Sequence, residues 1–234
     1  MRTFLLLGLL IATVVGAAGY SLASTEDSAT ARSIVHTQRT AAPSDIVAEA
    51  DHARRDHLRD YVLGVMRTWP SAKIEMVPLE DVAASIASAV ASDEPAWADD
   101  TTGARSAILL AALAYFEGAR FAKYVDDGTC NELGFVEHNP LAHYGTCDHR
   151  LAHSLWQIHE IQLAAPREDA TATALLDRDF AAHIALRLAR QSLAGTATLR
   201  NYTGEWSGPC PKADERLRFA DKAWREHPYA PPME

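Results

Sequence analysis

Glu117 is the residue whose surroundings most clearly suggest chemistry. At helical steps of three and four, it shares a face with Ser106, Leu110, Leu113 and Phe121. A carboxyl group held among apolar side chains has its neutral form favoured, and in this way a protein obtains a general acid near neutral pH. A structural role is the alternative, because Arg120, Lys123 or a backbone donor can satisfy a half-buried glutamate.

A second group of polar side chains lies between Ala152 and Gln162, a segment whose pattern predicts a short helix. On such a helix Ser154 and Gln157 are three residues apart and face the same way. Gln157 can both donate and accept hydrogen bonds, as binding a sugar hydroxyl or amide requires. A plain amphipathic helix explains the same pattern.

Together these segments resemble the lytic transglycosylases of the lysozyme-like superfamily. That family carries a catalytic Glu at the end of an apolar helix, usually as Glu-Ser, then a Gly-Leu-Met-Gln-Ile motif, then a Tyr-Asn-x-Gly motif before the closing helices. The counterparts here are Glu117-Gly118, Ser154-Leu155-Trp156-Gln157-Ile158 and Asn201-Tyr202-Thr203-Gly204. The resemblance covers about residues 104 to 227, and the first two motifs are moderately specific when they occur together.

This chain departs from the family at each motif. Gly118 replaces the serine, Ser154 replaces the motif glycine, and Trp156 replaces the methionine. Tyr202 stands two residues before Gly204 rather than three. We therefore expect a groove of different shape beside Glu117. We also expect the loop at 201–204 to shift its register, so that the Tyr202 hydroxyl still points towards Glu117.

The resemblance implies a mostly α, lysozyme-like domain that cleaves peptidoglycan between N-acetylmuramic acid and N-acetylglucosamine. Glu117 would protonate the leaving oxygen and then, as a base, take the proton of the muramic acid 6-hydroxyl while an anhydro ring closes. Ser154, Gln157 and Tyr202 would bind the substrate. The implied partner is the glycan strand, no cofactor is needed, and we expect a monomer.

Two other functions are compatible with the same motifs. A hydrolytic lysozyme more often uses a second carboxylate, and Asp126 or Asp127 is available for it. A non-catalytic protein that binds the cell wall can keep the fold without turnover, because a fold does not fix a function.

Cysteine and histidine side chains crowd one segment, and zinc binding is therefore a further alternative. These residues are Cys130, His138, His143, Cys147, His149, His153 and His159. The segment contains neither a Cys-x-x-Cys pair nor a His-Glu-x-x-His motif, and an oxidising compartment favours a disulfide. We therefore expect a bond between Cys130 and Cys147, a free Cys210 and no metal.

The beginning of the chain predicts export. Arg2 precedes a small and apolar run from Phe4 to Ala18, and Ser21-Leu22-Ala23 supplies the small residues that signal peptidases accept. A retained anchor is the alternative, although about 20 strongly apolar residues are normally needed to span a bilayer. We expect a signal peptide over 1–23, a periplasmic or extracellular location, and no stable membrane insertion after cleavage.

The net charge argues against two classes of partner. The formal charge is -9, and removing Arg2 with the signal gives -9 - 1 = -10. An acidic surface of this kind argues against nucleic acid and anionic lipid.

The remaining pattern predicts the elements that carry these residues. A Ser/Thr/Ala-rich linker over 24–44 precedes two N-terminal helices within 45–95, at 45–69 and 79–92. The proposed catalytic domain, 96–234, then holds an apolar helix at 104–121, an irregular stretch at 122–151, a helix starting at Asp169 or Thr171 and ending near Gly195, and a last helix from Pro211 to before Pro228. No convincing strand pattern appears, and so the expected class is mostly α with at most a small β element.

Overall fold

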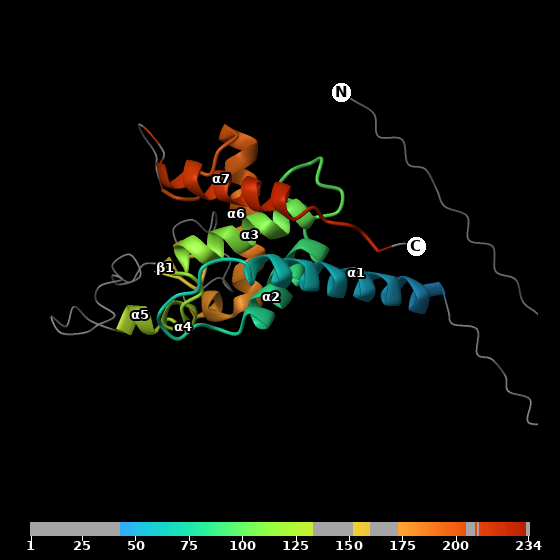
Figure 1. Cartoon of the computed structure of the whole chain (residues 1–234), viewed down its shortest axis with the longest axis horizontal. Helices are drawn as coiled ribbons and strands as arrows, with labels where there is room; N and C mark the ends of the chain where they lie inside the picture. The colour runs from blue at the N-terminus through green and yellow to red at the C-terminus, as the bar shows by residue number, and fades with distance from the viewer. Residues whose placement is uncertain (1–42, 133–151, 160–172, 205–208, 210, 233–234) are drawn as a thin grey trace, which may run out of the picture. The chain divides into compact units, whose positions relative to one another are not determined.

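The computed structural model describes residues 43–132, 152–159, 173–204, 209 and 211–232 (Figure 1). These residues are mostly helical, as the sequence predicts. The helices are α1 (Pro43–Met66), α2 (Leu79–Ser92), α3 (Ala104–Glu117), α4 (Lys123–Asp126), α5 (Thr129–Glu132), α6 (Arg178–Thr196) and α7 (Pro211–Glu226), with a 3-10 turn η4 at Ala174–Leu176. The strands β1 (Ala152–His153) and β2 (Ile158–His159) form a small antiparallel hairpin.

Helix α3 is the centre of the fold. Its alanines and leucines favour a helix, and every residue from Ser106 to Tyr115 is buried. It packs against α7 on one side and against α1, α2 and α6 on the others (Figure 1). A helix that is apolar all round needs this complete covering, and its two ends are therefore the places where polar side chains meet the core.

The start of α3 is held by an internal carboxylate. Asp100 is 8% exposed, and its Oδ2 accepts hydrogen bonds from the backbone amide of Ser106 at 2.7 Å and from the Ser106 hydroxyl at 2.6 Å. The same hydroxyl oxygen accepts a hydrogen bond from the Ala96 amide at 2.8 Å. Asp100 thus supports the first turn of α3 from inside the core.

The two N-terminal helices belong to the same core as the later ones. Leu58, Val62 and Val65 of α1 are buried in the cluster that also contains α3 and α6 side chains. Residues 48–55 of α1 are exposed, which matches the predicted polar first half. Helix α2 has its predicted bounds, whereas α1 begins at Pro43, two residues before the predicted start at 45, and ends at Met66 rather than at 69.

The C-terminal tail lies against α1. The ring of Tyr229 makes edge contacts with His57 and Tyr61, and the Tyr61 hydroxyl donates to the carbonyl oxygen of His227 at 2.6 Å. The Ala230 carbonyl oxygen lies 2.8 Å from Nε2 of His57. Residues 227–230 thus hold the C-terminal tail against the second half of α1.

Two predicted helices differ from the structure. The segment 152–162 was predicted as a short helix, but its described part, 152–159, forms the β1–β2 hairpin. Helix α6 begins at Arg178 rather than near Asp169 or Thr171, because the Asp177 side chain accepts a hydrogen bond from the Phe180 amide and caps the helix there. Residues 160–172 lie outside the described part.

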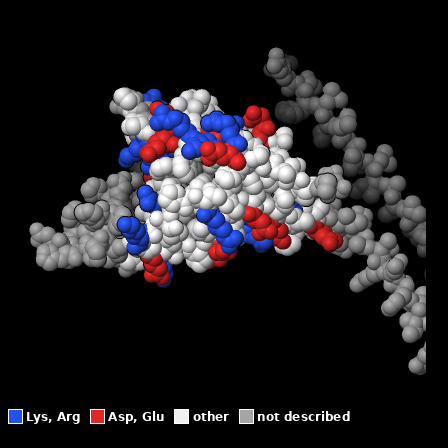
Figure 2. Space-filling model, viewed as in Figure 1, with Lys and Arg blue, Asp and Glu red and all other residues white. Residues whose placement is uncertain are grey.

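The outer helix α7 is strongly charged. Figure 2 shows basic and acidic side chains side by side over α7, at the top of the view. Across the described ranges, no helix combines the length and the apolar character needed to cross a membrane.

Candidate functional site

Glu117 is the last residue of α3, and its side chain meets an arginine. Nε of Arg216 donates to Oε1 of Glu117 at 2.8 Å, across the contact between α3 and α7. The Glu117 side chain is 21% exposed, and it therefore lies at the edge of the core. The sequence suggested Arg120 or Lys123 as the structural partner, but the observed partner is 99 residues away in the chain.

Arg216 is held by more than this ion pair. Its side chain is 10% exposed, its Nη1 donates to Oε2 of Glu215 at 3.0 Å, and its guanidinium carbon lies 4.8 Å from the centre of the Phe116 ring. The position of Arg216 in the sequence indicates that it is buried. Four buried residues of α7 recur at helical steps: Ala213, Arg216, Ala220 and Ala223. A buried arginine on an apolar stripe needs a counterion, and Glu117 provides one at the edge of the core.

The chain leaves Glu117 through a left-handed turn. Ala119, Arg120 and Phe121 have φ angles of 49°, 63° and 65°, a region that non-glycine residues rarely enter. Phe121 is held there because it is 2% exposed and its carbonyl oxygen accepts from the Val77 amide at 3.0 Å. The apolar pattern predicted a helix that ends at Phe121, but this turn ends the helix at Glu117.

Gly118 allows the hairpin to approach the end of α3. A Cβ atom at this position would lie 2.8 Å from Cδ2 of Leu155 and 2.9 Å from the Leu155 carbonyl oxygen. The same atom would lie 2.4 Å from the Ala114 carbonyl oxygen of α3, and a serine here would therefore displace both the helix end and the hairpin. The replacement of the family's serine by Gly118 therefore accompanies a tight contact between α3 and the hairpin.

The tip of the hairpin is a turn with two left-handed residues. Ser154 has a φ of 64° and Gln157 a φ of 47°. The Ser154 carbonyl oxygen accepts from the Gln157 backbone amide and from its Nε2, both at 3.1 Å. Ser154 is fully buried, with its Oγ 3.4 Å from the amide of Trp156, whereas Gln157 is half-buried. The two side chains thus belong to one turn rather than to one helix face.

Trp156 joins the hairpin to the helix and to the third predicted motif. It is fully buried, and its indole Nε1 donates to the Leu110 carbonyl oxygen of α3 at 3.0 Å. The Tyr202 hydroxyl donates to the Trp156 carbonyl oxygen at 2.9 Å. The regions around Glu117, Trp156 and Tyr202 therefore meet at the C-terminal end of α3.

The charges of Glu117 and Arg216 also affect the pKa of Tyr202. Burial raises the pKa of the Tyr202 hydroxyl well above its usual value, the negative charge of Glu117 raises it further, and the positive charge of Arg216 lowers it. Its phenol is therefore a protonated donor at neutral pH. The sequence predicted that Tyr202 points its hydroxyl at Glu117; the hydroxyl instead donates to Trp156, close enough to Glu117 for an electrostatic effect.

The two other candidate carboxylates have structural partners. Asp126 accepts hydrogen bonds from Nε and Nη2 of Arg178 at distances between 2.5 and 3.2 Å, and the pKa of Arg178 is raised chiefly by this contact. Oδ1 of Asp127 accepts from the Thr129 amide at 2.9 Å. Asp126 thus joins α4 to the start of α6, and Asp127 stabilises the start of α5.

The cysteine and histidine segment lies mostly beyond the described ranges. Cys130 is described and is 1% exposed, but Cys147 and Cys210 are not among the described residues. The Cys130–Cys147 disulfide therefore stays a prediction, which intact-mass measurements with and without reductant will test. Within the ranges that are described, no group of three His, Cys, Asp or Glu side chains is arranged to hold a metal ion. The predicted signal peptide, 1–23, also falls outside these ranges.

Comparisons of this chain with protein-family models, with curated proteins and with solved structures found no match. Its function is therefore argued from its own residues.

Proposed function

We propose that this protein is an exported peptidoglycan lytic transglycosylase with a lysozyme-like catalytic domain, in which Glu117 is the single acid and base. One observation carries the proposal: three segments that resemble successive motifs of that family meet at the C-terminal end of α3. Leu155 contacts Gly118, and Tyr202 donates to Trp156. The segments are separated by 35 or more residues of chain, and their convergence supports a shared site.

The departures from the family motifs also fit this reading. Ser154 occupies the position of the motif glycine, and its φ of 64° lies in the region that glycine favours. A backbone conformation suited to glycine is thus kept although the residue has changed. The non-glycine residues at positive φ near Glu117 and in the hairpin support a functional role, because such strain concentrates at active sites.

In the proposed reaction Glu117 gives its proton to the glycosidic oxygen and later takes one from the muramic acid 6-hydroxyl. Arg216 must then tolerate both charge states of Glu117. Glu215 supports this, because it keeps a carboxylate 3.0 Å from Nη1 of Arg216 when Glu117 carries a proton. Arg216 would thus retain a counterion through the whole cycle.

The contacts of Asp126 and Asp127 favour the lytic reaction over the hydrolytic alternative. Asp126 is 7% exposed and paired with Arg178, and Asp127 holds the start of α5. A hydrolytic enzyme more often uses a second carboxylate as nucleophile or water-activating base, and the two that the sequence suggested for this role are already engaged.

The ion pair between Glu117 and Arg216 also favours a second candidate, a wall-binding protein without turnover. In that case the pair is purely structural, and Glu117 serves only to neutralise a buried arginine.

Digestion of purified peptidoglycan by the wild-type protein and by Glu117→Gln tests the proposal. Lytic cleavage gives muropeptides ending in anhydro-muramic acid, one water lighter in mass than hydrolytic products, and the Gln variant releases none. Reducing-end products that still require Glu117 would indicate a lysozyme instead. Binding of cell walls without any product from the wild type would leave the non-catalytic candidate.

A further inference from the structure

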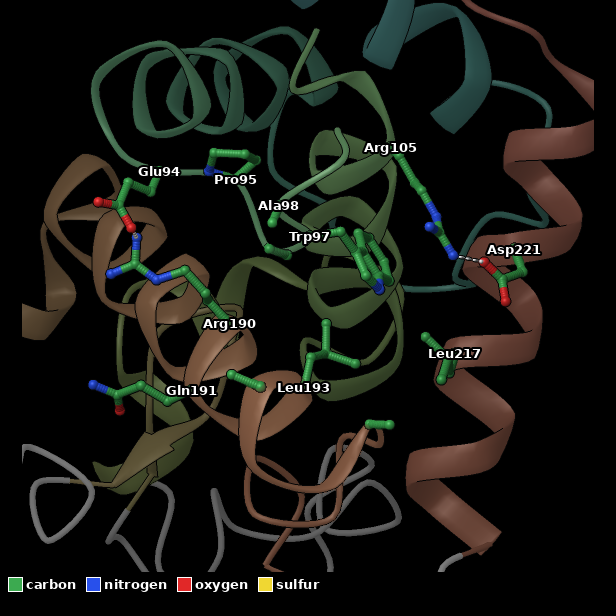
Figure 3. Close-up of a pocket in the computed structure, with 13 residues that line it drawn as sticks. Glu94, Pro95, Trp97, Ala98, Arg105, Arg190, Gln191, Leu193, Leu217 and Asp221 are labelled. Atoms are coloured by element: carbon green, nitrogen blue, oxygen red, sulfur yellow. Dashed lines mark hydrogen bonds and ion pairs between the residues drawn. The ribbon is translucent and has the colours of Figure 1, made fainter. Parts of the chain in front are cut away.

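A cavity of about 870 Å³ lies at the other end of α3, away from Glu117. Figure 3 shows the residues that line it. It is formed by α3, α6, α7 and the loop that joins α2 to α3. Arg105 lines it from the start of α3, twelve residues before Glu117. Twelve residues of helix span about 18 Å, and the cavity is therefore separate from the proposed catalytic site.

The floor of the cavity is apolar. It consists of the half-buried Trp97 with Leu193, Leu217 and the small side chains of Ala98, Ala194 and Ala197. Small side chains leave shallow space that fits methyl groups better than large rings. The guanidinium carbon of Arg105 lies 3.9 Å from the centre of the Trp97 ring, and one face of the ring is thereby covered.

An ion pair stands on each side of this floor (Figure 3). On one side Nη1 of Arg190 donates to Oε2 of Glu94 at 2.7 Å, and the Glu94 side chain remains 82% exposed. On the other side Nη2 of Arg105 donates to Oδ1 of Asp221 at 3.2 Å. Each side of the cavity thus carries a guanidinium and a carboxylate that are paired with each other, and the Glu94 carboxylate is the more accessible of the two, at 82% exposure against 30% for Asp221.

Arg105 is not fully satisfied. Its Nε is buried, and it has no hydrogen-bond partner among the residues that the structure describes. A buried donor without an acceptor is costly, and an anionic group entering beside Trp97 would supply one after a small rotation of the guanidinium.

We propose that this cavity binds a short zwitterionic peptide with small apolar side chains. Its carboxylate pairs with Arg105, its amino terminus pairs with Glu94, and its methyl groups lie on the floor of Trp97, Leu193 and Leu217. A fatty acid has no cation for Glu94, and a neutral sugar has no charge for either side. This binding goes beyond the proposed wall cleavage and does not require Glu117.

Titration of the purified full-length protein with trialanine tests the proposal. The indole N–H signal of Trp97, assigned by its loss in Trp97→Phe, reports binding in ¹⁵N–¹H NMR spectra. We expect saturable binding by trialanine, and binding at least about tenfold weaker for its C-terminal amide and for its N-acetyl form, because each loses one charge-assisted contact. These comparisons use the wild-type protein and do not depend on the folding of a variant.

Arg105→Gln should weaken trialanine binding at least about tenfold. The matched control is Arg67→Gln, because Arg67 makes a 2.6 Å ion pair with Glu80 outside the cavity, and this variant should bind as the wild type does. Equal binding of the amide, equal effects of the two arginine variants, or no saturation up to about 10 mM would overturn the proposal. Hexanoate binding as tightly as trialanine would also overturn it, in favour of a simple amphiphile.

Discussion

Asp100 and Glu117 are carboxylates at opposite ends of one buried helix, and their surroundings differ. Asp100 stands before the first turn of α3, where backbone N–H groups and the helix dipole favour a negative charge. It accepts hydrogen bonds from the amide and hydroxyl of Ser106. Glu117 ends the last turn, where the dipole opposes a negative charge, and its ion pair comes from Arg216 on another helix.

The difference separates a structural carboxylate from a candidate catalytic one. The charge of Asp100 is stabilised by groups of its own helix and neighbouring loop, and its removal should be felt mainly by the fold. The charge of Glu117 is offset by Arg216 of another helix, against an unfavourable dipole.

The largest expected effect is on turnover. Glu117→Gln keeps the shape of the side chain and removes its titratable proton, and we expect peptidoglycan cleavage to fall at least about a hundredfold. Asp100→Asn should leave turnover per folded molecule unchanged. Turbidity loss of cell-wall suspensions, normalised to the folded fraction, measures both. A similar loss of turnover in the two variants would remove the distinction between the two carboxylates.

The next largest effect is on stability, and here Asp100→Asn should have a larger effect than Glu117→Gln. Asp100→Asn weakens two charge-assisted hydrogen bonds in the core, and we expect the free energy of unfolding to fall by about 1–3 kcal/mol. Glu117→Gln should cost less, because its site is partly exposed and Arg216 retains Glu215. Urea unfolding followed by circular dichroism compares them. A larger loss in Glu117→Gln would mean that the Glu117–Arg216 pair is mainly structural.

A double-mutant cycle isolates the Glu117–Arg216 pair itself. For Glu117→Gln and Arg216→Gln we expect a coupling free energy of about 0.5–2 kcal/mol, since the two groups touch but lie at the edge of the core. Arg190→Gln, which breaks the more exposed pair with Glu94, is the control and should give no coupling with Glu117→Gln. Coupling of equal size in that control would point to a general electrostatic effect.

The smallest effect concerns Tyr202 at alkaline pH. Because its pKa is raised in the folded state, its phenol ionises first in the unfolded chain, and stability should fall as the pH rises above about 10. Tyr202→Phe should be less stable by about 1 kcal/mol at pH 7, through loss of the bond to Trp156. Its stability should then decline less steeply, so that the difference narrows or reverses near pH 11. If unfolding curves give the same difference in stability between the wild type and Tyr202→Phe at pH 7 and at pH 11, this result would contradict the burial of the hydroxyl.

The long helices were predictable because each carries its own signals. Helix α2 lies between Pro78 and the polar residues that follow Ser92, and α7 opens at Pro211. The apolar run of α3 likewise predicts a buried helix. These signals are local, and local chemistry was sufficient to find them.

The hairpin at 152–159 was not predictable in the same way. Its strands have two residues each, too few for an alternating pattern to show. Its left-handed positions are filled by Ser154 and Gln157 rather than by glycine or asparagine, and so the usual turn signature is missing. Contacts with α3 through Trp156 and Leu155 impose this conformation, and a reading of the segment alone does not include them.

The candidate site was predictable only in part. Glu117 and Tyr202 were identified, and the charge of Glu117 lies near enough to Tyr202 to add to the effect of burial on its pKa. Arg216 was missed because its helix is polar overall and distant in sequence, although its place between Ala213 and Ala220 marks it as buried. A search for charged residues on apolar helix stripes, applied to both helices, would have paired it with Glu117.

The left-handed turn at Ala119, Arg120 and Phe121 also limits how this sequence can drift over evolutionary time. Exposed positions of α7 accept many residues, but a position with positive φ accepts chiefly glycine, asparagine and aspartate without added strain. Phe121 must also fill the core, and that leaves it almost no substitutes. Homologues that keep Glu117 in this setting should therefore share a short segment after it that is far more uniform than the surfaces around it.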